Sequence, residues 1–468
     1  MTATALVRLA QAERPPDHPV SWRGTETITW NRFRAEVAAA AHHFAGGNAA
    51  ALICRDSHRF AVGLFGLLSA GVTVVLPPNA QPGTLAGLAG AFDRVIGDDD
   101  LPAAGDAMWT TPLPADRRID FFTSGSTGSP KRIACPLARL DGEVAVLERC
   151  WGAQVGGGTT LATVPHHHIY GLIFKLLWPL ASGRPFAAIT HDVWESLLAD
   201  LPAGAVVVSS PAHLSRLGGL APLPAARAPS LLLSAGAPLS AAAGADVVRV
   251  FGRMPTEIYG STETGAVATR TSSLVMGSKG SSLGGVQGQS PWWGARGQSP
   301  PLSPWYPLPG NQMTIDSDGR LLLRSPYAAP DDWMPLADRA EATGDGGFYL
   351  RGRIDRVAKI EGKRIGLDEV ERDLHALIEV EAAAVLVLDG EAAVLAAAVV
   401  PSAAGWRQLD EFGRFRFSRR LRFALSATQE AAGLPRRWRF VEALPTDTLG
   451  KRSTVVLAGL FAEADHHD

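Results

Sequence analysis

The sequence predicts an α/β fold with two domains: a large N-terminal domain built on buried sheets, and a small, mobile α+β domain at the C-terminus. Three observations predict it: the length of 468 residues, alternating apolar and helix-like runs up to about residue 350, and a change of character after Gly352. One domain per roughly 150 residues gives two or three domains at this length. Hydrophobic residues at 46% and charged residues at 19% fit a folded globular protein.

The N-terminal part contains short apolar runs, punctuated by glycine and proline, that we interpret as strands. These runs are 50–54, 72–76, 205–209 and 231–234, and the stretch 140–151 has the character of a helix. Short strands that alternate with helices are typical of an α/β domain with a largely buried sheet.

The longest apolar run, from Phe60 to Leu76, is interrupted by glycines and falls just short of a membrane-spanning helix. We interpret it as a buried helix up to about Ala70 that is stopped by glycine. A strand from Val72 follows and ends where Pro77 begins a proline pair.

The C-terminal part, from residue 352 onward, predicts a smaller α+β domain. A charged segment leads into a helix. Residues 382–388 and 392–400 predict a β-hairpin, because Asp389-Gly390 suits a two-residue primed turn. Residues 414–432 predict a basic helix.

The domain boundary is expected near Asp355, which gives domains of 1–353 and 354–468. Residues 271–304 of the first domain are rich in Gly, Ser, Pro and Gln and have no helical or strand period. This composition is typical of a long loop or a disordered insertion, and an irregularity of the sequence itself is the other interpretation.

The charge balance and the cysteines exclude several classes of protein. Lys and Arg total 44 and Asp and Glu total 46, which argues against a protein whose main task is to hold nucleic acid. The three cysteines have no CxxC spacing, so they predict neither a disulfide framework nor a zinc site. A reducing cytoplasm is the simplest compartment, and the first residues lack the apolar stretch of a signal peptide.

The first segment that carries chemistry runs from Phe121 to Lys131, where hydroxyl residues and glycines precede a lysine. Glycines let backbone N–H groups approach an anion, hydroxyls donate further hydrogen bonds, and the ammonium adds charge. The segment therefore predicts a phosphate-binding loop, with an ordinary Ser/Thr/Gly turn as the alternative. It is not a Walker A loop, because Lys131 follows Pro130 and precedes Arg132.

Three further polar segments are 257–265, 352–371 and 444–454. In the first, Glu263 stands in a turn rich in hydroxyls and glycine, where a carboxylate is suited to hold Mg²⁺ beside phosphate oxygens. In the last, a glycine allows a tight turn that presents Lys451. Taken singly, each segment is also typical of a surface turn or a solvated run of charges.

In this order, the four segments resemble the motifs of the adenylate-forming superfamily of acyl- and aryl-CoA synthetases, luciferases and adenylation domains. Pro165–Gly171 is similar to that family's PxxHxxG segment, and Ser234–Leu239 is similar to its adenine-side glycine strand. The resemblance covers about residues 120–455. Within the superfamily, TSGSTGSPKRI followed by HHHIYGLIFKLLWPL looks most like the acyl/aryl ligases of aryl-polyene and xanthomonadin-type pigment pathways.

Two departures from the family pattern stand out. The family's Thr-Gly-Asp turn is present as Leu336-Ala337-Asp338, which keeps only the aspartate. The 271–304 segment also interrupts the stretch before Trp305–Gly310, which looks like the family's WxPLPG. This interruption is expected to perturb the acyl pocket.

The resemblance implies an enzyme that activates a carboxylic acid with ATP and transfers the acyl group to a thiol. It implies that Glu263 holds Mg²⁺, that Thr262 contacts the α-phosphate, and that Lys451 reaches the α-phosphate and the carboxylate. The small domain is expected to rotate about a hinge at Asp355. The residues expected to bind ATP or AMP are Thr123, Ser124, Gly125, Ser126, Thr127, Gly128, Lys131, Gly236, Ala237, Pro238, Tyr259, Gly260, Ser261, Asp338 and Arg353.

The acyl pocket is expected near His167, His168, Tyr170 and Gly236. Histidine and tyrosine there suit a small aromatic acid with a polar substituent, such as a hydroxybenzoate, and a medium-chain fatty acid stays open. The implied cofactors are ATP, Mg²⁺ and either CoA or phosphopantetheine on a separate carrier protein. A degenerate adenylate-binding protein is the non-catalytic alternative, which the retained catalytic residues disfavour.

Three other patterns carry less weight. Gly280–Gly284 fits the GxSxG motif of serine hydrolases but has no strand before it and no helix after it. Adjacent histidines on an extended chain point to opposite faces, so His166–His168 cannot all chelate one ion. Phe174, Leu177 and Trp178 have helical spacing and are expected in the core.

Overall fold

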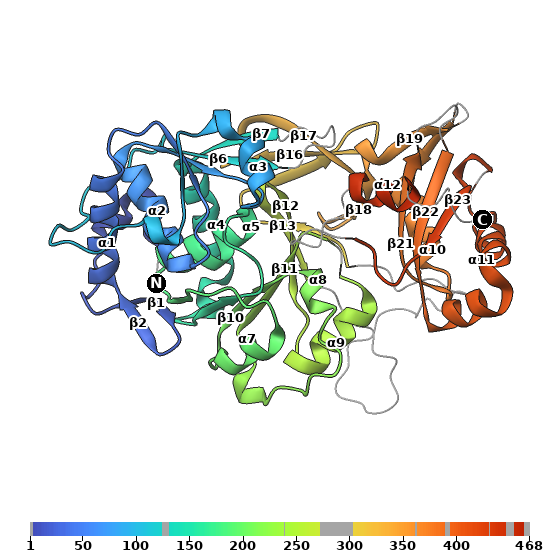
Figure 1. Cartoon of the computed structure of the whole chain (residues 1–468), viewed down its shortest axis with the longest axis horizontal. Coiled ribbons are helices and arrows are strands. Elements are labelled where there is room, and N and C mark those ends of the chain that lie inside the picture. The colour runs from blue at the N-terminus through green and yellow to red at the C-terminus, as the bar shows by residue number, and fades with distance from the viewer. Residues whose placement is uncertain are drawn as a thin grey trace. The chain divides into compact units, whose positions relative to one another are not determined.

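The computed structural model of the protein describes most of the chain (Figure 1). The described residues divide into a larger unit, formed mainly by residues up to 271 with Trp305–Met313 and Leu323–Met334, and a smaller unit formed mainly by Pro335 onward. The proposed boundary at 353/354 stays a prediction. The described ranges are 3–123, 131–237, 239–271, 303–360, 363–388, 394–429, 431–445 and 454–462.

The larger unit contains a nine-stranded sheet whose central strands are parallel neighbours. Parallel strands are covered on both faces, so they consist of nearly continuous apolar residues, and all four residues of β10 are buried. The runs predicted as strands at 205–209 and 231–234 are β10 and β11, which confirms them. The strand order is β14 (Tyr306–Pro307), β13 (Gly265–Thr271), β12 (Thr256–Ser261), β11 (Leu231–Ala235), β10 (Val206–Ser209), β8 (Thr160–Ala162), β9 (Phe186–Ala187), β1 (Pro19–Arg23) and β2 (Glu26–Thr29).

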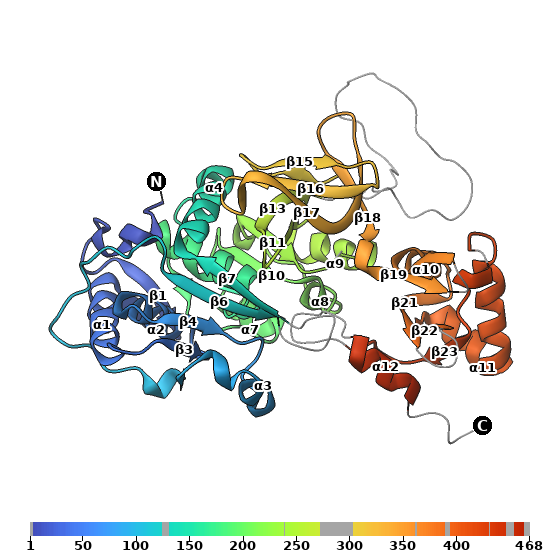
Figure 2. The same cartoon turned by 90° about the horizontal axis from the view of Figure 1, so that it is seen from above.

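A second sheet of five strands belongs to the same unit, with α1 and α2 packed beside it (Figure 2). Its first strands are parallel, and its last pair is an antiparallel hairpin of β6 and β7. That hairpin brings the two ends of the proposed phosphate loop together. The strand order is β5 (Arg94–Ile96), β3 (Ala49–Leu52), β4 (Thr73–Leu76), β6 (Arg118–Thr123) and β7 (Lys131–Pro136).

Helix α2 (Ser57–Ala70) confirms the interpretation of the longest apolar run. The Asp56 side chain caps it by accepting a hydrogen bond from the Arg59 backbone N–H at 2.9 Å. The helix ends at Gly71, whose φ of 83° is left-handed, and β4 follows. Among the described residues, no helix is long and apolar enough to cross a membrane.

The expected core helices are also present. Helix α4 (Leu137–Val155) contains the stretch predicted at 140–151. Phe174, Leu177 and Trp178 are almost fully buried, as expected, although Leu172–Leu177 (η4) is a π-helix. The other α-helices of this unit are α1 (Trp30–His43), α3 (Pro82–Gly87), α5 (Ile169–Gly171), α6 (Trp178–Ala181), α7 (Trp194–Asp200), α8 (Pro211–Leu214) and α9 (Ala241–Phe251).

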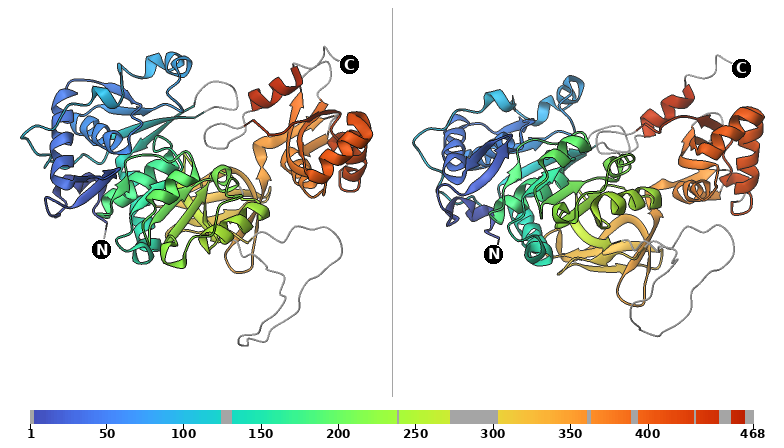
Figure 3. Two further views of the ribbon diagram at one scale, coloured as in Figure 1. Left: turned by 60° about the horizontal axis from the view of Figure 1, so that its bottom comes forward. Right: turned by 90° about the horizontal axis from the view of Figure 1, so that it is seen from below.

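A four-stranded sheet follows in the chain, and the smaller unit adds two sheets after it (Figure 3). Alternate residues of β21 and β22 face two different hydrophobic clusters, one shared with α10 and α11 and one with α12. The elements are β15 (Gln312–Ile315), β16 (Arg320–Ser325), β17 (Ala329–Ala342), β18 (Phe348–Arg353), β19 (Val357–Ile360), β20 (Lys363–Gly366), α10 (Leu367–His375), β21 (Val380–Leu388), β22 (Val394–Pro401), α11 (Ala403–Leu425), β23 (Arg437–Phe440) and α12 (Thr454–Ala462).

One local prediction for this unit needs correction, and another is tested in part. The hairpin of β21 and β22 is confirmed, with a register that pairs Leu388 with Val394. Its predicted turn residues Asp389 and Gly390 lie outside the described residues. The basic helix begins earlier and ends at Leu425, and Gly413 interrupts it with a φ of 73°. Apolar periodicity identifies a helix but does not show where tertiary packing bends or stops it.

The α/β fold class is thus confirmed. The structure does not describe two of the patterns seen in the sequence, the Gly- and Ser-rich segment and the GxSxG motif within it. Residues 272–302, which make up nearly all of the Gly- and Ser-rich segment and include Gly280–Gly284, lie outside the described residues.

The left-handed end of α2 yields a stability test. Gly71→Ala should destabilise the protein by roughly 1–2 kcal/mol, because an L-residue is strained at this φ and its Cβ would lie 3.3 Å from the Arg117 guanidinium. Gly83→Ala is the control, since that helical glycine has no neighbouring atoms within 4 Å. Urea unfolding measures both, and equal effects would show that the left-handed stop is not a constraint.

Candidate active site

The proposed phosphate loop connects two strands that are directly hydrogen-bonded to each other. Thr123 ends β6, Lys131 begins β7, and the register places these two residues opposite each other. The loop is therefore the tip of a hairpin whose base is fixed. Its predicted phosphate-binding residues Ser124, Gly125, Ser126, Thr127 and Gly128 lie outside the described residues.

Lys131 and Glu263 are 132 positions apart and meet in the folded chain. The ammonium nitrogen of Lys131 lies 2.8 Å from Oε1 of Glu263, with the side chains 61% and 39% exposed. Partial burial alone would raise the pKa of Glu263, but the hydrogen bonds from Lys131, from Ser261 and from its own backbone N–H, with the charge of Lys131, together outweigh burial, and the pKa is lowered. Glu263 is thus an anion beside the base of the phosphate loop.

Glu263 and Thr262 lie in the tight turn between β12 and β13. Ser261 and Thr264 close the turn with two hydrogen bonds, Ser261 N–H to Thr264 Oγ1 at 2.9 Å and Thr264 N–H to Ser261 Oγ at 3.2 Å. Gly260 has no room for a side chain, because a Cβ there would lie 2.0 Å from the Gly265 carbonyl oxygen. The glycines and hydroxyls of this motif therefore build the turn that presents the carboxylate.

Two residues of helix α4, one helical turn apart, form hydrogen bonds with the backbone of this turn. Arg139 donates to the Thr262 carbonyl at 2.8 Å, and Oε1 of Glu143 accepts the Ala266 N–H at 2.8 Å. The Tyr327 hydroxyl donates to the Ala266 carbonyl. These positioning residues were missed by the sequence analysis. The available signal was a pair of opposite charges at i, i+4, of which Glu143 lies inside the predicted helix 140–151 and Arg139 directly before it.

Glu143 is unusual because its carboxyl group is buried. The side chain is 1% exposed, and burial raises the pKa of Glu143 to about 7. Gly265, with a φ of 67°, makes room for it, since a Cβ there would lie 2.2 Å from Oε2 of Glu143. Gly265, which ends the turn motif, is therefore required because any side chain at this position would collide with Glu143 of α4.

The residues proposed for the adenine side lie at the ends of β11 and β12. Gly236 follows β11 with a φ of 102°, which favours glycine, and Ala237 comes next. Tyr259 lies in β12, and its ring centroid is 5.7 Å from that of Trp305. The remaining member of this set, Pro238, lies outside the described residues.

Glu257, the first carboxylate of the turn motif, has a structural role. It forms a buried ion pair with Arg270 at 2.9 Å, and its other oxygen accepts the Leu239 N–H at 3.4 Å. The Arg270 guanidinium in turn stacks 4.4 Å from the Trp305 ring. Glu257 therefore fixes the strands on which the adenine-side residues stand.

The three consecutive histidines do not follow the expected alternation. They lie in a turn rather than an extended chain, and the rings of His167 and His168 contact each other with centroids 4.3 Å apart and an angle of 44° between their planes. His166 is buried and is held by the Ser57 hydroxyl at 2.9 Å and the Cys54 carbonyl at 2.8 Å. Among the described residues, no three His, Cys, Asp or Glu side chains form a group that could hold a metal ion.

The remaining acyl-pocket residue, Tyr170, lies in the short helix α5, which continues into the apolar π-helix Leu172–Leu177. Its ring lies 5.1 Å from that of Phe174, and burial raises the pKa of Tyr170 well above its usual value. Lys175 is fully buried one turn later and donates to the Thr190 hydroxyl at 2.6 Å. Burial, with a smaller contribution from Lys175, lowers the pKa of His167 to about 4, so this part of the wall is neutral.

In the smaller unit, Asp338 and Arg353 lie opposite each other in β17 and β18. Asp355 belongs to a short 3₁₀ helix (Ile354–Arg356). The Asp368 carboxylate accepts a hydrogen bond from the Arg353 N–H at 2.7 Å and also pairs with Arg356, so it holds the chain on both sides of Asp355. Lys451 lies outside the described residues.

Oxygen donors at the turn fit Mg²⁺. One carboxylate with hydroxyls nearby is the donor set that this ion takes from a protein when substrate phosphates and water complete its octahedron. Glu263 provides the carboxylate, and its exposure leaves it open to such a ligand. Glu143 is excluded from this role because it is buried against Ala266 and Gly265.

An α/β unit in which Lys131, at the end of the predicted phosphate loop, meets the carboxylate of Glu263 fits the class of enzymes that act on a nucleoside triphosphate. Residues 99–320 match the family of AMP-binding enzymes. The chain is 30% identical over 369 residues to a 4-coumarate–CoA ligase of Rhodobacter capsulatus, covering 78% of this chain and 80% of that one. It is 29% identical over 314 residues to a medium/long-chain-fatty-acid–[acyl-carrier-protein] ligase of Mycobacterium tuberculosis, covering 62% and 56%.

Solved structures with the same fold include ATP-bound MatB from Rhodopseudomonas palustris, with a TM-score of 0.71, 18% identity and 99% of both chains covered. The AMP complex of O-succinylbenzoate CoA synthetase from Bacillus subtilis has a TM-score of 0.72 and 17% identity, with 100% and 98% covered. The chain belongs to the AMP-binding enzyme family and is an AMP-forming acid–thiol ligase. Its reaction uses ATP, Mg²⁺ and the thiol of CoA or of carrier-bound phosphopantetheine.

The buried Glu143 gives a prediction with two readouts. Glu143→Leu should lower kcat about tenfold, because the Ala266 N–H loses its acceptor and the turn that carries Glu263 loosens. Glu143→Gln should restore most of the rate, since an amide oxygen can accept the same bond. Pyrophosphate release measures both variants, and equal losses would contradict a positioning role.

The same carboxyl group should make stability depend on pH. The unfolded group ionises near 4.5 and the folded group near 7, so the unfolded state binds fewer protons in that window and stability falls as pH rises. Glu143→Gln removes this loss, so its stability relative to the parent should increase between about pH 5 and about pH 8. Urea unfolding at both values checks the sign.

Proposed function

We propose that the protein activates a small aromatic carboxylic acid with a polar substituent, such as a hydroxybenzoate or hydroxycinnamate. The acid would be converted to an acyl-adenylate and passed to CoA or to the phosphopantetheine of a carrier protein. The observation that carries the proposal is the close contact of the His167 and His168 rings next to Tyr170, with His167 neutral because burial lowers its pKa to about 4. Aromatic rings favour a planar acid, and their polar edges favour a hydroxyl group on it.

In the first half-reaction, a carboxylate oxygen of the acid attacks the α-phosphorus of ATP, and pyrophosphate leaves. Lys131 and the hairpin loop would bind the β- and γ-phosphates, and Thr262 would donate to the α-phosphate. Asp338 and Arg353 would bind the ribose hydroxyls. Lys451 would offset the charge that develops on the phosphoryl group, which is where fixed donors contribute most to the rate.

Glu263 would hold Mg²⁺, and the bound ion would neutralise phosphate charge. In this structure Glu263 is paired with Lys131. When ATP binds, phosphate oxygens would compete with Glu263 for Lys131, which frees the carboxylate for its metal role. The ion pair thus keeps both groups in place before the substrate arrives.

In the second half-reaction, the thiol sulfur attacks the acyl carbon and AMP leaves. We propose that the C-terminal domain, 354–468, rotates about Asp355 between the two steps and withdraws Lys451. Asp368 holds both Arg353 and Arg356, on either side of Asp355. A rotation about Asp355 therefore has to break one of these two contacts.

A medium-chain fatty acid is the second candidate substrate. It is favoured by the similarity to fatty-acid–carrier-protein ligases such as those of Mycobacterium tuberculosis and Mycobacterium marinum. The similarity to a 4-coumarate–CoA ligase and to a 4-chlorobenzoate–CoA ligase of an Arthrobacter species supports the aromatic acid. We also propose a place among the aryl-polyene and xanthomonadin-type ligases and a cytoplasmic location, the latter supported by three free cysteines.

The experiment that tests the substrate class is pyrophosphate release with a panel of acids at equal concentration. Hydroxybenzoates and hydroxycinnamates should give kcat/KM values at least about tenfold above those of octanoate and unsubstituted benzoate, because a buried polar group rejects an analogue that leaves it unpaired. His168→Leu should reduce this preference. A preference for octanoate would establish the fatty-acid alternative instead.

The half-reactions should respond differently to two substitutions. Glu263→Gln and Lys451→Ala should each slow pyrophosphate release by about two or more orders of magnitude. Lys451→Ala should spare thioester formation from a synthetic acyl-adenylate, because that lysine is withdrawn in the second step. Glu195→Gln, at an exposed helical site, is the control. If Lys451→Ala slowed both halves equally, the domain rotation would be wrong.

A further inference from the structure

The second half of α11 has an outer face that is unusually aromatic. Its inner face is a ridge of buried residues, Phe417, Leu421 and Leu425, spaced four apart against the core of the smaller unit. Phe415 and Phe423 lie on the opposite side and are 73% and 81% exposed. Exposed phenylalanines two turns apart on one helix indicate a surface that another molecule covers.

The same face carries a concentrated positive charge. From Arg414 to Leu425 the sequence has five arginines and no acidic residue. Four of the arginines are exposed and form no ion pair with any residue in the part of the chain that the structure describes. We call the exposed residues of this stretch the arginine–phenylalanine face, and they are Arg414, Phe415, Arg416, Arg419, Arg420 and Phe423. The fifth arginine, Arg422, is half-buried and donates to the Pro435 carbonyl at 3.3 Å.

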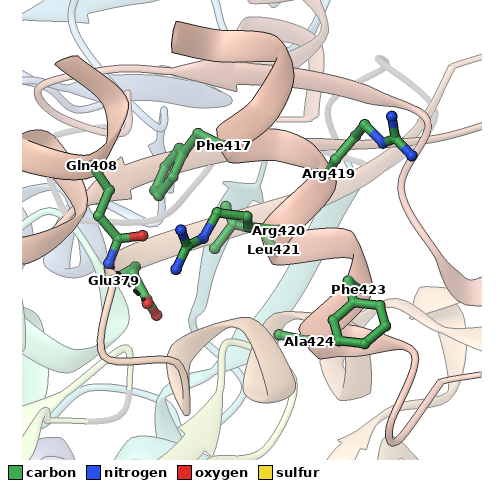
Figure 4. Close-up of a pocket in the computed structure, with 8 residues that line it drawn as sticks. All are labelled: Glu379, Gln408, Phe417, Arg419, Arg420, Leu421, Phe423 and Ala424. Atoms are coloured by element: carbon green, nitrogen blue, oxygen red, sulfur yellow. Dashed lines mark hydrogen bonds between the residues drawn. The ribbon is translucent and has the colours of Figure 1, made fainter. Parts of the chain in front are cut away.

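A hollow of about 550 Å³ adjoins this face, between the two halves of α11 (Figure 4). Gln408 comes from the first half and Phe423 from the second, and Glu379 closes the third side. Figure 4 shows the Arg420 guanidinium directed toward Glu379 and Gln408, whereas Arg419 points away from them. The halves flank the hollow because Gly413 interrupts the helix with φ 73° and ψ 163°, a conformation almost confined to glycine.

We propose that the arginine–phenylalanine face docks an acidic surface of the phosphopantetheinyl carrier protein that delivers the thiol. This rests on the proposed function, in which the acceptor is either CoA or a carrier. Charge complementarity selects an acidic partner, and unpaired arginines steer its approach. Phenylalanine and arginine are also the residue types enriched at protein interfaces. CoA is a small molecule and has no need of a face that extends over three helical turns.

An anionic lipid surface is the other ligand that arginines and phenylalanines can bind. The hollow argues for a protein partner, because a side chain that projects from a protein can fill it. A bilayer surface has no projecting side chain. Glu379 also lies in the hollow, where its negative charge would oppose lipid phosphates.

The test is thioester formation by the full-length enzyme with two acceptors, CoA and a bacterial fatty-acid carrier protein bearing phosphopantetheine. The double variant Arg419→Glu/Arg420→Glu should lower kcat/KM for the carrier at least about tenfold. Its kcat/KM for CoA and its pyrophosphate release should stay within about twofold of the parent. Phe423→Ser should lower carrier transfer in the same selective way, and added salt should weaken transfer by the parent more than by the double variant.

The matched control is Arg149→Glu/Arg216→Glu, which makes the same change in net charge at exposed positions of the larger unit. Unchanged carrier transfer in the Arg419/Arg420 variant, or an equal fall with CoA, would overturn the proposal. So would an Arg419/Arg420-dependent binding to phosphatidylserine vesicles without any effect on carrier transfer. If the parent released pyrophosphate but charged only CoA, the ligase function would stand and the docking face would be wrong.

Discussion

The candidate active site depends on the hydrogen bonds by which α4 fixes the turn between β12 and β13. Arg139 binds the carbonyl of Thr262, and Glu143 binds the amide of Ala266, so both ends of the turn are tied to one rigid helix. Glu263 projects from the turn between these anchors and reaches Lys131 across the gap between two sheets. Because α4 directly follows β7, the same stretch of chain positions both the lysine and the carboxylate.

In the larger unit, several buried polar side chains hold neighbouring strands and turns in place. Glu143 sits beneath Gly265, Glu257 is locked to Arg270, and Lys175 is buried behind the histidine turn. Each group has at least one hydrogen-bond or ion-pair partner, which offsets part of the cost of burying it. The outcome is a set of buried anchors around the exposed ion pair of Lys131 and Glu263.

The smaller unit shows a different organisation. Its sheet is covered on one face by α10 and α11 and on the other by α12. Asp368 ties the chain before and after Asp355 to α10. On the outer side of α11, arginines and phenylalanines stay exposed although the same helix buries a full apolar ridge. The inward residues are explained by stability, and the outward ones form the surface that we propose for a carrier protein.

The sequence by itself determined the α/β class, the helix and strand around Gly71, and the segments that carry Lys131 and Glu263, because each depends on local periodicity, turn chemistry or motif spacing. Only the tertiary structure decided which neighbours these segments have. The pairing of Lys131 with Glu263 and the hydrogen bonds of Arg139 and Glu143 to the turn between β12 and β13 depend on contacts between distant parts of the chain. Sequence spacing carries no information about such contacts, since it is the packing of sheets and helices that brings their atoms together.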